Sequence, residues 1–145
     1  MKPVILTAAL AFATATAAHA EAPITTAYEG SFDDGAFAVE TAIVGQGLVI
    51  DYVSHVGEML NRTGEDVGSD VTIFKEADIF LFCSAVVSRE VMEADPMNIA
   101  HCPYGIFVAE DADGAVTIGY RDYPDGPMEK VEALLAEIVK EATEN

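Results

Sequence analysis

The chain has 145 residues, 51% of them hydrophobic, and 25 acidic residues against 7 Lys and Arg give a formal charge of −18 at pH 7. This charge excludes nucleic acid and anionic membrane surfaces as partners, because phosphate binding needs clustered Lys or Arg and the basic residues here are scattered. The acidic surface would instead keep the chain in solution or steer a cationic periplasmic protein toward it.

The first twenty residues have the three parts of a cleavable secretory signal. Lys2 supplies the positive start, a short apolar stretch follows, and Ala18, His19 and Ala20 form a small-x-small cleavage site. The apolar stretch is shorter than the roughly 20 residues that span a bilayer. We therefore expect cleavage after Ala20, export to the periplasm, and no membrane attachment afterwards. The remaining residues 21–145 suffice for one domain and not for two.

Hydrophobic periodicity in the first half of the chain predicts a strand, a helix, a second strand and a short helical turn. Ser31 or Asp33 can cap the first helix, because either side chain can accept a hydrogen bond from a free backbone amide. Apolar residues at helical spacing and a following Gly-Gln-Gly run set its extent. The expected elements are a strand at 24–29, a helix from 31 to the glycines at 45–47, a strand at 48–53, a helical turn at 56–61 and a polar loop at 64–69.

The second half opens with residues 77–83, a nearly continuous apolar run that predicts a strand covered on both faces. Ser84 begins a helix that ends at Asp95, because a residue before proline disfavours helix. Residues 104–109 and 116–120 predict two strands, joined by an acidic turn that ends in Gly114. The last helix has an apolar stripe made of Met128, Val131, Leu134, Leu135 and Ile138.

This order, β-α-β-α-β-α-β-β-α, predicts one α+β domain. We expect a single mixed, largely antiparallel sheet with helices packed mainly on one face. The last two strands must be antiparallel, because only a short turn joins them. A sheet face without helices would need a partner, so the pattern also favours a homodimer.

Several segments follow one another in a characteristic order and spacing over residues 31–124. They are Ser31 through Val53, Phe80 through Ser84, Asp95-Pro96, Cys102-Pro103, Val108 through Gly114 and Gly119 through Pro124. This arrangement resembles the family known as domain of unknown function 302. Where many members have Gly-Asn-Pro or Cys-Asn-Pro, this chain has Cys83, Ser84 and Ala85. The resemblance implies an α+β fold, a dimer, and no established activity.

The two cysteines, Cys83 and Cys102, are the strongest functional signal in the chain. In an exported protein they favour a structural disulfide, which would stabilise the fold by about 3 kcal/mol through closure of a loop of about 20 residues. A redox pair is the second interpretation, with Cys83 as the attacking thiolate at a helix N-terminus and Cys102 resolving. Two inert buried thiols are the third. The sequence has no Cys-x-x-Cys, the close spacing that would favour a redox enzyme. A structural disulfide is therefore favoured over a redox pair.

Soft-metal binding is a further hypothesis for the same segment. Cys83, His101, Cys102, Met92 and Met97 are donors that suit Cu(I). His101 and Cys102 are neighbours on an extended segment and should point to opposite faces, so no metal site is assigned. Covalent haem attachment is excluded, because Pro103 follows Cys102, and no cofactor is expected.

Small-molecule contact is expected near the two cysteines. The candidates are His101 and Ser84 beside the cysteines, with Tyr104 and Tyr120 on adjacent strands and Tyr123 after them. His55 is read as a surface or capping histidine. No catalytic residue is assigned, since the sequence has no nucleophile elbow and no phosphate-binding glycine loop.

The sequence therefore predicts a small exported binding or accessory protein that is non-enzymatic or at most a redox accessory. The alternatives are a thiol–disulfide or sulfur-handling factor and a copper carrier.

Overall fold

The computed structural model describes residues 22–144. The expected signal segment, residues 1–20, lies outside this range. Within it, no helix is long and apolar enough to cross a membrane.

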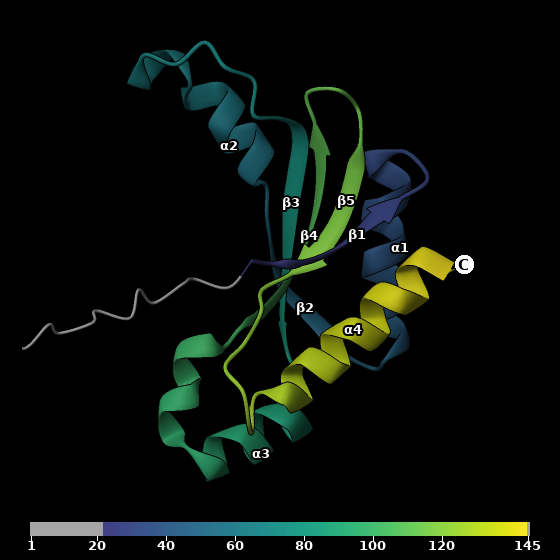
Figure 1. Cartoon of the computed structure of the whole chain (residues 1–145), viewed down its shortest axis with the longest axis vertical. Helices are drawn as coiled ribbons and strands as arrows, with labels where there is room; N and C mark the ends of the chain where they lie inside the picture. The colour runs from purple at the N-terminus through teal and green to yellow at the C-terminus, as the bar shows by residue number, and fades with distance from the viewer. Residues whose placement is uncertain (1–21, 145) are drawn as a thin grey trace, which may run out of the picture.

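A five-stranded sheet forms the centre of the molecule, with strand order β1-β5-β4-β3-β2 (Figure 1). All four pairings are antiparallel, so the predicted α+β fold is confirmed and the sheet holds no parallel pair. The strands are β1 (Ile24–Tyr28), β2 (Val49–Ser54), β3 (Phe74–Cys83), β4 (Tyr104–Asp111) and β5 (Val116–Tyr120).

The helices follow the predicted order, and two short 3₁₀ turns are added. The helices are α1 (Phe32–Gly45), α2 (Val56–Thr63), α3 (Ala85–Ala94) and α4 (Glu129–Glu144), and the turns are η1 (Glu65–Val67) and η2 (Pro96–His101). Ser31 caps α1, since its Oγ accepts from the backbone amide of Asp34 at 3.2 Å. Ser84 caps α3 in the same way, accepting from Val87 at 3.3 Å.

The core lies between one face of the sheet and helices α1 and α4, which lie on the same side of it in Figure 1. We call this side the inner face. The predicted stripe of α4 is buried there, with Val131, Leu135 and Ile138 fully enclosed. Each such side chain contributes about 1.5–3 kcal/mol by leaving water. The inner-face strand residues are Phe80, Phe82, Tyr104, Ile106, Val108, Val116, Ile118 and Tyr120.

The opposite side of the sheet departs from the sequence prediction. The apolar run of β3 predicted burial on both faces, yet Ile79 and Leu81 are only partly buried while Phe80 and Phe82 are buried. The physical reason is topology: α1 and α4 both pack on the inner face, α3 lies beyond the strand ends, and α2 contacts β3 near its start. One apolar face of the sheet is left without a helix.

Candidate functional site

Cys83 and Cys102 lie side by side at the ends of neighbouring elements. Cys83 is the last residue of β3, and Cys102 follows η2 just before β4. Because Phe82 pairs with Tyr104 across the two strands, the two cysteines are brought together. Both are free thiols that are partly buried, and their side chains are near enough to affect each other's ionisation. The predicted proximity of the pair is therefore present, without a covalent bond.

The pKa of Cys83 differs from the sequence expectation. We expected the start of α3 to favour a thiolate, but burial, reinforced by the hydrogen bond to Cys102, raises the Cys83 pKa from 9.0 to about 12. The reason is local. Ser84, and not Cys83, occupies the capping position of α3 and receives the free amide of Val87. Cys83 lies one residue outside the helix, where desolvation dominates.

His101 stands next to this pair with an unused polar atom. Its Nδ1 is buried and has no hydrogen-bond partner within residues 22–144. Its ring meets Tyr123 edge-on, with ring centroids 5.7 Å apart and planes at 69°. The segment that carries Tyr123 is held by α4, because the Glu132 Oε1 accepts from the Tyr123 backbone amide at 2.6 Å.

Tyr104 and Tyr123 connect His101 with α3. Their rings are 6.3 Å apart and nearly perpendicular, at 86°. The Tyr104 hydroxyl lies 3.0 Å from the Ser88 Oγ, so a hydrogen bond ties β4 to α3. Burial raises the pKa of Tyr123 from 10.0 to about 12 and also raises that of Tyr104. Both tyrosine hydroxyls are therefore neutral at physiological pH.

The predicted ligand-contact residues separate into two environments. Tyr104 and Tyr120 are buried in the core, at 0% and 5% exposure, and Ser84 is used as a helix cap. Tyr123 instead lines a cavity of about 340 Å³ on the helix-free side of the sheet, together with Pro103. Ligand contact by His101, Tyr104, Tyr120 and Ser84 stays a prediction.

The soft donors proposed for copper are not gathered at one point. Met92 packs against the core from α3, and Met97 is 71% exposed on η2. Among the described residues, no cluster of three His, Cys, Asp or Glu side chains has the arrangement of a metal site. The thiols of Cys83 and Cys102 are the two soft donors that lie together.

Two polar hollows lie away from the thiols. His55 lines a cavity of about 690 Å³ between α2 and the start of β3, and its Nδ1 lies 2.7 Å from the Asp78 Oδ1. The His55 side chain is 59% exposed, as expected of a surface histidine. His55 directly precedes α2, but its side chain makes no capping hydrogen bond to the helix. The side chain contacts Asp78 instead.

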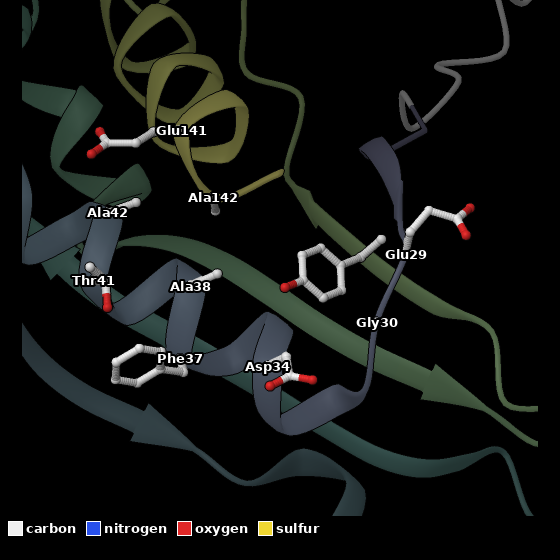
Figure 2. A pocket seen from close by; sticks show the side chains of 10 residues that line it. Glu29, Gly30, Asp34, Phe37, Ala38, Thr41, Ala42, Glu141 and Ala142 are labelled. Atoms are coloured by element: carbon white, nitrogen blue, oxygen red, sulfur yellow. The ribbon is translucent and has the colours of Figure 1, made fainter. Parts of the chain in front are cut away.

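The second hollow, of about 360 Å³, lies between the start of α1 and the end of α4 (Figure 2). Glu29, Asp34 and Glu141 make its rim acidic. Two of these carboxylates already have structural roles: Ser31 donates to the Asp34 Oδ2 at 2.6 Å, and Gln46 donates to the Glu141 Oε2 at 3.2 Å. These two carboxylates of the hollow therefore take part in the cap of α1 and in the contact between α1 and α4.

Sequence reasoning did not single out Ser88 and Asp78 as partners of Tyr104 and His55. Ser88 lies four residues after Ser84, on the same side of α3, and that spacing was the available signal. No comparable signal pointed to Asp78, because its partner His55 is 23 residues away.

The open antiparallel sheet with helices on one face defines a small α+β domain. The family described as "Domain of unknown function DUF302" matches residues 24–145, so the chain belongs to this family. The chain is similar in fold to an uncharacterized conserved DUF302 protein from Bacillus stearothermophilus, known from its crystal structure. The TM-score is 0.60 at 16% identity, over 83% of this chain and 91% of that one. No curated protein matches this sequence.

Proposed function

We propose that this chain is a small exported accessory protein, not an enzyme, whose Cys83 and Cys102 are joined in a disulfide once it reaches an oxidising compartment. The observation that carries the proposal is the proximity of the two thiols, at the ends of paired strand segments. Two cysteines placed side by side in this way need little backbone movement to approach bonding distance. Export supplies the compartment in which the bond persists.

The oxidation needs an external disulfide, which we assign to a thiol oxidase of the same compartment. One thiol, as thiolate, attacks the oxidase disulfide, and the second thiol then displaces the oxidase sulfur. Each cysteine gives up one hydrogen, and the oxidase disulfide becomes two thiols. Because its pKa is raised to about 12, Cys83 is a poor first attacker.

The same pKa argues against the redox-factor alternative. A rapid thiol–disulfide exchanger needs an attacking cysteine that is ionised near neutral pH, whereas burial keeps Cys83 protonated. The bond would instead hold the end of β3 against the segment that enters β4. Its closure of a loop of about 20 residues contributes about 3 kcal/mol to the free energy of unfolding.

A reduction potential tests the proposal. The chain beginning at Glu21 would be equilibrated in glutathione buffers of graded potential, quenched in acid and alkylated. We expect an intramolecular disulfide with a potential below about −300 mV, the range of structural disulfides. A value near that of catalytic dithiols, about −120 to −230 mV, would support the redox factor and contradict the proposal.

Metal analysis of the same protein in its reduced form distinguishes a copper carrier from an accessory protein. One equivalent of Cu(I) that resists a thiol competitor, and that is lost in Cys83→Ser, would favour metal transport. The accessory role predicts no metal in fixed ratio.

A further inference from the structure

The sheet has two edges, formed by β1 and β2. In the strand order β1-β5-β4-β3-β2, β1 pairs only with β5 and β2 pairs only with β3. One side of the backbone of each edge strand therefore has no strand partner within residues 22–144. The amides and carbonyls on such a side form a template for a further strand, and native proteins usually protect them.

The edge of β2 is protected, and the edge of β1 is not. The register of β2 shifts between Ile50 and Tyr52, and the residue at this bulge is the charged Asp51. A bulge and a charge both oppose the addition of a strand. By contrast, β1 pairs with β5 in continuous register from Ile24 to Tyr28 and holds no charged residue, glycine or proline. Of the two edges, β1 is the one that can accept a further strand.

Alternate residues of β1 lie on the inner face of the sheet. Thr26 and Tyr28 pair with Ile118 and Val116, which are buried on that face. The side chains of an added strand would alternate in the same way. Those on the inner face would lie beside Tyr28, at the hollow of about 360 Å³ between the start of α1 and the end of α4 (Figure 2).

This hollow has an aromatic wall. Tyr28 and Phe37 both line it, and Phe37 is 70% exposed. The Tyr28 ring lies over Gly35, where an added Cβ would be 3.2 Å from the ring, so the absence of a side chain at position 35 makes room for it. An alkylammonium or guanidinium group is attracted to the faces of such rings.

The rim of the hollow is acidic, and its carboxylates differ in what they already contact. Ser31 donates to Asp34, and Glu141 accepts from Gln46. Glu29 directly follows β1 and makes no ion pair within residues 22–144. None of the described residues that line the hollow is a Lys or an Arg. The Glu29 carboxylate is therefore open to a cation supplied from outside.

Charge determines which kind of strand fits this edge. A formal charge of −18 repels acidic segments, a second copy of this chain included, and attracts basic ones. At the far end of β1, Ile24 pairs with Tyr120, which Arg121 and Asp122 follow. The opposite charges of these two residues leave that end without a preference. The basic residues of a partner therefore fit best at the Tyr28 end.

We propose that the free edge of β1 binds an extended basic segment of a partner protein, which adds as a further strand and places a Lys or Arg side chain in the hollow lined by Tyr28, Glu29 and Phe37. Backbone hydrogen bonds supply affinity, and the hollow selects the charge. This inference goes beyond the proposed function and does not depend on a disulfide. The strands β5 and β4 separate β1 from β3, the strand that ends at Cys83.

Fluorescence anisotropy with a synthetic peptide tests the inference. The probe is a fluorescein-labelled peptide of eight residues that alternate between valine and lysine, and the protein is the chain beginning at Glu21. Alternation places all the lysines on one face of the added strand. We expect saturable binding at physiological salt with a Kd below about 100 µM, for the oxidised and the reduced protein alike. Absence of binding, including through occupation of the edge by a second copy, would overturn the proposal.

A second peptide tests whether the probe pairs as a strand. It keeps every lysine and replaces the two central valines by proline, which has no backbone N–H to donate. Its charge is unchanged, so attraction by charge alone would be unchanged too. We expect it to bind at least tenfold more weakly. Equal binding of the two peptides would overturn strand addition.

Protein variants test the hollow. Glu29→Lys should weaken binding of the first peptide at least fivefold, because it places a cation where the lysine side chain enters. Glu65→Lys is the matched control: it makes the same change of charge at an exposed residue of η1, beyond α2 (Figure 1). Phe37→Ala should weaken binding as well, through loss of the ring. Equal effects of Glu29→Lys and Glu65→Lys would overturn the assignment of the hollow, and circular dichroism checks that each variant is folded.

Discussion

At the scale of single residues, Cys83 shows how burial can outweigh a nearby helix start. The positive end of α3 should favour a thiolate, but the free amide of Val87 at this helix start donates to Ser84. Cys83 faces Cys102 and a partly apolar surrounding, which favours the protonated form. A cysteine at a helix start is therefore reactive only where its sulfur itself receives the free amides.

This account predicts a slow, strongly pH-dependent reaction of Cys83 with iodoacetamide in the reduced protein. The Cys102→Ser variant isolates Cys83. Its alkylation rate should still be rising above pH 10, because burial, the largest cause of the raised Cys83 pKa, is retained in this variant. Stopped alkylation with mass detection gives the rates, and a plateau near pH 9 would show an ordinary thiol.

At the scale of elements, α2 is held by backbone approach and not by a large apolar stripe. Only Gly57 of this helix is buried. A Cβ there would collide with the backbone nitrogen of Ala77. The helix can therefore lie this close to β3 only because position 57 has no side chain.

Gly57→Ala should accordingly loosen α2, in spite of alanine's higher helix propensity. We expect a loss of about 1–3 kcal/mol in the free energy of unfolding, the cost of overpacking. Gly45→Ala in α1 is the control, because its Cβ would meet only the end of the Glu141 side chain, at 3.4 Å. That variant should be neutral or gain up to about 1 kcal/mol. Urea unfolding measures the change in the free energy of unfolding for both variants. Equal changes would contradict the argument that α2 needs a glycine at its closest approach to β3.

The elements themselves were largely predictable because their signals are local. Ser31, the glycines after α1 and Pro96 mark the ends of helices in the sequence, and each does so in the structure. The turn η2 after Pro96 was missed, since no periodic pattern marks so short a segment. For the site, the cysteine pair was predictable from their places at strand ends. The His101–Tyr123 contact was not, because it depends on the path of the segment after β5 and its anchor on Glu132.

At the scale of the whole molecule, one sheet separates two surfaces of different character. The inner face is closed by α1 and α4, and the opposite face has no such cover. Around both lies a surface with a large excess of negative charge. This acidic surface opposes non-specific association between copies of the chain.

The buried neutral acids predict a loss of stability in alkali. The pKa values of Cys83 and Tyr123 are both about 12 in the folded protein, above their ordinary values of 9.0 and 10.0. Between pH 9 and pH 12 the unfolded chain releases protons that the folded chain retains, so the free energy of unfolding falls as pH rises. The stabilisation is complete below pH 9. Urea midpoints of the reduced protein across this range would show the decline, and a flat profile would contradict it.

Oxidation should reduce this pH dependence, because a disulfide sulfur does not titrate. The oxidised protein retains only the tyrosine contribution, and its midpoint should fall less steeply than that of the reduced protein. The Cys83→Ser, Cys102→Ser double variant gives the tyrosine contribution alone.

The count of free thiols in protein recovered from a periplasm tests the central claim most directly. The protein would be expressed with residues 1–20, recovered from the periplasm without reductant, denatured and alkylated before mass measurement. We predict no alkyl group before reduction and two after it, on a chain that begins at Glu21. Two alkyl groups without reduction would show that Cys83 and Cys102 remain thiols, and would contradict the account.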